Sequence, residues 1–165
     1  MKKKIYYSKS DPWLLNLKFI EDLFKNCKSG SRIILHDSNN NKIHQMVIMH
    51  TINNYIVPHI NNKSSKSFNL LKGKMYFIWF DIQGNFKGKI LLNSKNNFVR
   101  FNSNLYHTLV PISSKVYFIE TILGPHLKTK YAKWAPKSLE EIKLFNEKIK
   151  KFIRSKSKLN YNNLY

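Results

Sequence analysis

Short apolar runs separated by turn-forming residues fill the chain between residues 31 and 123. They recur at intervals of roughly 8–12 residues with no helical pattern between them, which is typical of a β-sandwich or small barrel. The run at 74–80 is apolar on both faces, which predicts an inner strand. The predicted strands are 31–36, 42–50, 54–60, 67–73, 74–80, 86–92, 97–101, 106–112 and 115–123.

A helical pattern precedes the strands at residues 10–27. Ser10 or Asp11 is a suitable cap, Pro12 suits the first turn, and Gly30 marks the end. The sequence therefore predicts an amphipathic helix before the first strand.

A second helical pattern follows the strands at residues 136–154. Ser138 and Glu141 have the spacing of a capping box. Packing against the sheet is favoured over lying on anionic lipid, which the lysines outside the apolar stripe would also permit. The last eleven residues are polar and predicted to fray. The stripe comprises Leu139, Ile142, Phe145, Ile149, Phe152 and Ile153.

These patterns divide the chain into three parts. Residues 1–30 form an N-terminal helical segment, residues 31–135 form the β-barrel, and residues 136–165 form a C-terminal helix with a basic tail. The total of 165 residues is the size of one ordinary domain.

The net charge of +20 suggests a polyanionic partner at first sight. However, the cations are 26 Lys and only 3 Arg, alongside 20 Asn and 18 Ile, the mixture that AT-rich codons encode. Arginine forks, the usual tools of nucleic-acid recognition, are nearly absent. Codon bias is therefore the favoured explanation and nucleic acid is disfavoured as a partner, with a functional polyanion-binding surface as the alternative.

Other features of the sequence indicate the cellular compartment in which we expect the protein. No apolar run reaches 18 residues, so no membrane span is predicted, and the basic start lacks the apolar stretch of a signal peptide. The single cysteine, Cys27, excludes an internal disulfide and a thiolate zinc cluster. We expect a cytoplasmic protein.

Two of the six histidines lie in suggestive frames. His59 follows Pro58 and precedes a polar loop, and His107 lies about fifty residues later in a second strand pattern. The two frames resemble the two motifs of a cupin barrel. The chain further resembles the WbuC family of cupin-fold proteins, which occur with O-antigen gene clusters. The matching pieces are Arg32, 35–38, Tyr55, 58–59, 63–68, 71–73, 80–84, 106–110, Glu120, 124–125 and 134–136.

This resemblance implies a fold and a pathway more than a reaction. The fold would be an all-β cupin double-stranded β-helix, a jelly-roll barrel with one α-helix at each end. The pathway would be O-antigen, lipopolysaccharide or other sugar-nucleotide metabolism, with a small polar or sugar-type ligand in the barrel. Cupin barrels also pair, so a homodimer is the implied assembly. No enzymatic activity is assigned.

The metal motif departs from the cupin pattern of three histidines and one glutamate. His59 and His107 remain, but Asn61 stands at the second histidine position and Lys66 at the glutamate position. No acidic residue occurs between Asp37 and Asp81 to replace it. A lysine ammonium opposes a cation through like charge. We therefore expect either no metal or a weakly bound divalent ion on His59 and His107.

The predicted ligand pocket contains seven residues. Lys66, pointing inward, would occupy the vacated metal position and bind an anionic or carbonyl-bearing ligand, or act as a base or nucleophile; the alternative is a solvated loop lysine. Glu120 alternates with apolar strand residues and would pair with a pocket cation or with a backbone turn. The seven are Arg32, His36, His59, Asn61, Lys66, His107 and Glu120.

The sequence also permits two other functions. One is a metal-dependent cupin enzyme that uses His59, His107 and a strand histidine such as His44 or His50. The other is a basic module that binds nucleic acid or an anionic surface through its lysines.

Overall fold

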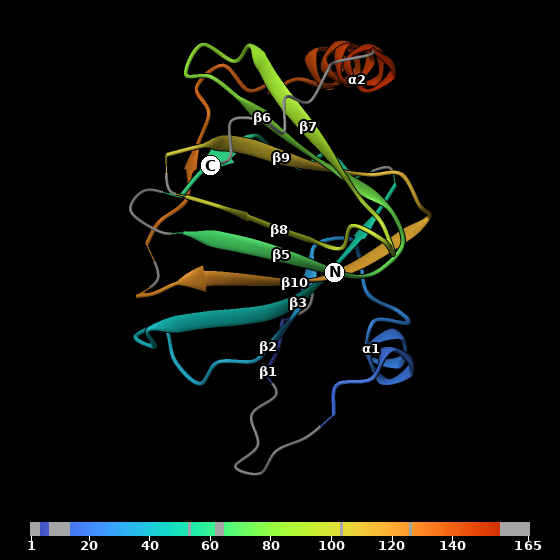
Figure 1. Ribbon diagram of the computed structural model, residues 1–165, viewed down its shortest axis with the longest axis vertical. Helices are drawn as coiled ribbons and strands as arrows, with labels where there is room; N and C mark the ends of the chain where they lie inside the picture. The colour runs from blue at the N-terminus through green and yellow to red at the C-terminus, as the bar shows by residue number, and fades with distance from the viewer. Residues whose placement is uncertain are drawn as a thin grey trace.

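Two β-sheets face each other and enclose the core, as the computed structural model shows (Figure 1). The structure describes residues 4–6, 14–52, 54–61, 65–102, 104–125 and 127–155. One sheet has the strand order β1-β2-β3-β10-β5-β8 and the other β11-β4-β9-β6-β7. The strands are β1 (Lys4–Tyr6), β2 (Ser31–Ile34), β3 (Ile43–Thr51), β4 (His59–Ile60), β5 (Lys66–Lys72), β6 (Met75–Phe80), β7 (Phe86–Leu92), β8 (Phe98–Phe101), β9 (Tyr106–Pro111), β10 (Lys115–Leu123) and β11 (Lys130–Tyr131).

Strand pairing is antiparallel except at one edge, where β1 runs parallel to β2. The sequence does not predict β1 or β11, which are only three and two residues long. The strand predicted at 54–60 shortens to β4, because Pro58 has no N–H to donate to a ladder. Residues 54–57 instead line cavities that are described below.

Alternate residues of the strands form an apolar core between the sheets. Phe68, Phe77 and Phe118 are each at most 2% exposed and lie in this cluster, with their rings in tilted or edge-on contact. The apolar strand predicted at 74–80 is β6, which lies between β9 and β7. Its two apolar faces are used, since Met75 and Phe77 enter this core while Ile78 and Phe80 enter a second one.

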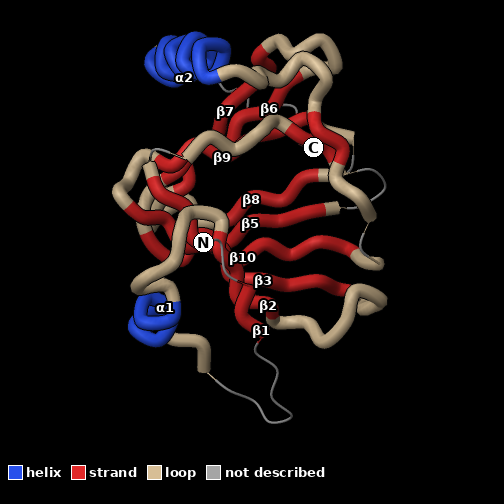
Figure 2. The backbone as a smooth tube through the Cα atoms, turned by 180° about the vertical axis from the view of Figure 1, so that it is seen from behind, coloured by secondary structure: helices blue, strands red, loops and turns tan. Residues whose placement is uncertain are grey.

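The first helix, α1 (Leu17–Leu23), packs Ile20 and Phe24 against the outer face of the larger sheet (Figure 2). It is shorter than the helix predicted over 10–27, because Asn16 caps it by accepting a hydrogen bond from the Phe19 amide at 2.9 Å. The predicted caps Ser10 and Asp11, together with Pro12 and Trp13, lie outside the described residues.

The second helix, α2 (Leu139–Arg154), covers the outer face of the smaller sheet, over β6 and β7 (Figure 1). Its predicted capping box is present, with Ser138 and Glu141 bonded reciprocally. Ile149 is buried against Ile78 and Phe80, so the helix packs on the sheet as predicted. Leu139, however, is 87% exposed and does not belong to the packed stripe. The predicted frayed tail falls almost wholly outside the described residues.

Candidate ligand-binding site

A cavity of about 230 Å³ lies in the barrel between the two sheets. Five of the seven predicted pocket residues line it: Arg32, His59, Asn61, Lys66 and Glu120. Strand alternation places them there, because Lys66 shares its face of β5 with Phe68, and Glu120 shares its face of β10 with Phe118.

Lys66 and Glu120 form an ion pair in the wall of this cavity. The Lys66 Nζ donates to the Glu120 Oε2 at 3.2 Å, and the two side chains are only 3% and 14% exposed. Burial acts to raise the pKa of Glu120, but the charges of Lys66 and Arg32 outweigh it and hold that pKa below its usual value. Lys66 thus points inward as one prediction required, yet its charge is already partnered by Glu120.

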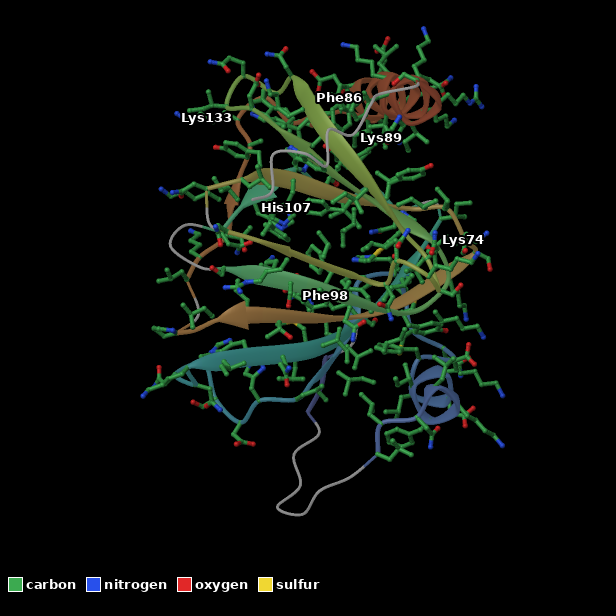
Figure 3. All side chains as sticks on the ribbon, in the orientation of Figure 1. Lys74, Phe86, Lys89, Phe98, His107 and Lys133 are labelled. Carbon is green, nitrogen blue, oxygen red and sulfur yellow. The ribbon has the colours of Figure 1, made fainter. Side chains whose placement is uncertain are left out.

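His59 and His107 face each other across the pairing of β4 and β9. Their ring centroids are 4.4 Å apart, and His107 projects into the space between the sheets (Figure 3). Each Nδ1 donates to the carbonyl two residues earlier, His59 to Val57 and His107 to Leu105, both at 2.9 Å. This leaves each Nε2 as the unprotonated nitrogen of a neutral ring.

Both imidazoles are kept neutral. Burial, and then the charge of Lys66, lowers the pKa of His59 to about 4. Burial, with His59 and Lys66 beside it, holds the pKa of His107 well below its usual range. His107 is fully buried and does not itself line the cavity; its Nε2 has no hydrogen-bond partner among the described residues. The pair therefore adds no positive charge near pH 7.

Asn61 and Arg32 are the other predicted pocket residues that line the cavity. The Asn61 amide donates to Thr129 Oγ1 at 3.2 Å, whereas its Oδ1 is buried and has no partner within the described part of the chain. Arg32 is exposed and forms no ion pair with any described residue. The site therefore contains one acceptor without a partner, which is closed off from the cavity, and one cation without an ion-pair partner among the described residues.

His36 does not lie with the other predicted pocket residues. Its ring stacks on His44 with centroids 4.2 Å apart, and its Nδ1 donates to the Gln45 carbonyl at 3.0 Å. His36 does not line the cavity. It follows the end of β2 and is held by β3, so sequence proximity to Arg32 is a poor guide to its position.

The described residues do not fit a divalent metal. The carboxylate of Glu120 is bonded to the Lys66 ammonium, whose charge lowers the pKa of both histidines and likewise opposes a cation beside them. Among the residues that the structure describes, no group of three or more His, Cys, Asp or Glu side chains is placed to hold an ion. His126 lies outside the described residues.

Thr129 and Tyr131 also line the cavity, and the sequence did not indicate them. Tyr131 lies in β11, a two-residue strand that pairs with β4, and Thr129 comes just before this strand. So short a strand has no alternation that could reveal it. Pairing with β4 brings Thr129 to Asn61 and places the Tyr131 ring 6.3 Å from that of His59.

A larger hollow of about 480 Å³ lies between β9 and α2. Its lining is mainly aliphatic, with Lys150 and Arg154 among its polar members. Asn54, Tyr55, Ile56 and Leu109 line both hollows, so this segment and one β9 side chain separate them. The barrel cavity is the better candidate site, because buried charged and polar groups converge on it.

The sequence has limited matches to known families. Residues 21–92, less than half of the chain, match a family described as Domain of unknown function (DUF6016). No curated protein matches the sequence. No described helix has the length and apolar character needed to cross a membrane.

Solved structures share the fold at low sequence identity. BH2720 from Bacillus halodurans has a TM-score of 0.56 and 12% identity, covering 72% of this chain and 86% of that chain. The capsular polysaccharide assembling protein CapF from Staphylococcus aureus has a TM-score of 0.55 and 12% identity, over 74% of this chain but only 33% of CapF. An uncharacterized Klebsiella pneumoniae protein with a double-stranded β-helix domain has a TM-score of 0.51 and 10% identity, over 64% and 80% of the two chains.

These likenesses confirm the predicted fold class. The chain is a mainly β protein with the double-stranded β-helix of the cupins, and it carries a helix near each end.

Proposed function

We propose that this cupin-fold chain is a binding protein of surface-polysaccharide metabolism that holds a small, polar, sugar-type ligand in its barrel. The observation that carries the proposal is the cavity, whose lining brings together the Lys66–Glu120 ion pair, Arg32 and the polar residue Asn61. Sugars are recognised through such convergent donors and acceptors. Likeness to CapF, described as a capsular polysaccharide assembling protein, favours this area of metabolism.

Membership of the WbuC family is part of the proposal. Two of the segments that resemble the WbuC family are in contact in the structure. A Cβ atom added to Gly84 would lie only 2.7 Å from the Trp134 ring. Gly124, in a third segment, is similarly tight against the Asn41 carbonyl. In both places the close approach leaves no room for a side chain, which accounts for the glycine. The proposal extends to a role with O-antigen-type polymers in the cytoplasm, and it assigns binding without a reaction.

Ligand binding to the barrel tests the proposal. Saturation-transfer NMR with a panel of neutral and anionic monosaccharides should give signals with the wild-type protein. The variant Asn61→Leu, which keeps the side-chain size, makes this part of the cavity wall apolar and removes the bond to Thr129, should weaken them at least about fivefold. A panel without any binder, or binding unchanged in Asn61→Leu, would overturn a barrel site for sugars.

A further inference from the structure

The charges around the barrel cavity do not balance. Arg32 and Lys66 contribute two positive charges, and Glu120 contributes one negative charge. His59 is neutral near pH 7, since its pKa is lowered to about 4. The cavity therefore has an excess of at least one positive charge.

Arg32 is the cation that can bond an anionic ligand, because the Lys66 ammonium is already bonded to Glu120. The Lys66 ammonium bonds Glu120, whereas the Arg32 guanidinium has no ion-pair partner among the described residues. A guanidinium presents a planar fork of N–H donors that matches a carboxylate or phosphate group. An anionic group of a ligand in the cavity would bind there.

The other groups call for hydrogen-bond donors on the ligand. Asn61 is 8% exposed and its buried Oδ1 accepts no bond from a described residue. Glu120 uses Oε2 for Lys66, and a carboxylate has further acceptor sites on both oxygens. The Asn61 Oδ1 is closed off from groups the size of water, so the carboxylate of Glu120, whose side chain is 14% exposed, is the acceptor that a ligand hydroxyl can reach.

The size of the cavity suits a ligand with one sugar ring. Its volume of about 230 Å³ lies just below the range of about 300–1,000 Å³ that is usual for small-molecule sites. A single hexose ring is therefore the size of ligand that this space favours.

We propose that the barrel binds a single-ring sugar carrying one anionic group, with the anion on Arg32 and a ring hydroxyl on Glu120. The inference rests on the proposed function and adds the substrate class. A uronate carboxylate and a sugar phosphate have the required chemistry in common, and the experiment separates them.

Isothermal titration calorimetry with four probes tests the inference. Glucuronate and glucose 1-phosphate carry the anion and the ring, glucose carries only the ring, and acetate carries only the anion. We expect at least one of the first two to bind about 10- to 100-fold more tightly than glucose and acetate, because charged hydrogen bonds are the stronger ones. The tighter of the two identifies the anion as carboxylate or phosphate.

Two matched variants localise the effect. Arg32→Gln should remove the preference for the anionic sugar over glucose, whereas Arg100→Gln should leave it intact, since Arg100 is exposed on β8 and does not line the cavity. Circular dichroism verifies that both variants fold.

The outcomes separate this inference from the proposed function. Glucose binding as tightly as the anionic sugars, or an anion preference that survives Arg32→Gln, overturns the inference and leaves a sugar-binding barrel. Acetate binding as tightly as the anionic sugars overturns the role of the hydroxyls. Absence of binding by all three sugars overturns both proposals.

Discussion

Lys66 and Glu120 form an ion pair that is almost entirely withdrawn from water. Such a pair is weak evidence for stability, because desolvation of both charges offsets their attraction. Removing one partner is different, since it leaves an uncompensated buried charge. The intact pair is therefore expected to add little net stability, whereas removing one partner is costly.

We expect Lys66→Met to lower the free energy of unfolding at pH 7 by about 3 kcal/mol, because Glu120 loses its partner. Urea denaturation measures the change. The double variant Lys66→Met/Glu120→Gln should recover most of the loss. Lys87→Met, at an exposed position on β7, is the control and should change the value by less than about 0.5 kcal/mol. Equal losses in Lys66→Met and Lys87→Met would contradict the buried pair.

His59 makes the stability depend on pH. The unfolded chain protonates this imidazole near pH 6.5, but the folded protein does so only near pH 4, chiefly because of burial. The unfolded state therefore binds more protons between these values, and stability falls as the pH is lowered from 6.5 to 4, by up to about 3 kcal/mol. His107 acts in the same direction.

Urea denaturation at several pH values across this window tests the effect of His59. In His59→Gln the loss of stability between pH 6.5 and 4 should be clearly smaller, because the glutamine does not titrate. An unchanged pH slope in this variant would show that other groups produce it.

At the scale of elements, a lysine of the smaller sheet bonds the C-terminal end of α2. Lys89 of β7 is 8% exposed, and its Nζ donates to the carbonyls of Phe152, Ile153 and Ser155 (Figure 3). The last carbonyls of a helix lack partners within the helix and attract positive charge. A buried lysine thus serves as a C-terminal cap supplied by another element.

Replacing this lysine should loosen α2. We expect Lys89→Met to lower the free energy of unfolding by about 2 kcal/mol, since the charged bonds at the helix end are lost. Hydrogen exchange should quicken at the amides of residues 149–154 and stay unchanged in β3 and β10. Uniform quickening over the whole chain would instead indicate a general loss of stability.

Elements were predictable where a local pattern was long enough to be seen. The strands at 86–92 and 115–123 coincide with β7 and β10, because alternation and turn residues determine both limits. The capping box of α2 also lies in adjacent sequence. β1 and β11 were missed because a strand of two or three residues exists only through its partner.

Candidate site residues were predictable only one at a time. Lys66 and Glu120 stand out as polar residues in apolar patterns, but their contact depends on the pairing of β5 with β10. Local sequence does not encode that register. The same reason explains Thr129, which reaches Asn61 across 68 positions of the chain.

At the scale of the whole molecule, the charge of +20 works against folding. The 29 Lys and Arg repel one another across a small surface with only 9 acidic residues to offset them. The ion pairs Lys72–Glu21 and Lys150–Glu147 are exposed and contribute little. The compact state therefore concentrates a repulsion that the expanded chain relieves.

Added salt should therefore stabilise the protein. Screening shortens the reach of these charges from about 30 Å at 0.01 M to about 8 Å at 0.15 M salt. We expect the melting temperature, measured by calorimetry, to rise over this range and then level off. A plateau of the melting temperature near 0.15 M salt distinguishes screening from effects that keep growing at high salt concentration. A melting temperature that falls with added salt would mean that attractive charge pairs dominate.

The segment that carries Tyr55 and Ile56 separates the barrel cavity from the hollow beneath α2. A wall shared by two volumes makes them thermodynamically interdependent. A ligand that pushes this wall outward enlarges its own chamber at the expense of the other, and linkage requires the effect to be equal in both directions. Any such displacement would couple occupancy of the barrel to the hollow under α2, without contact between the ligand and the helix.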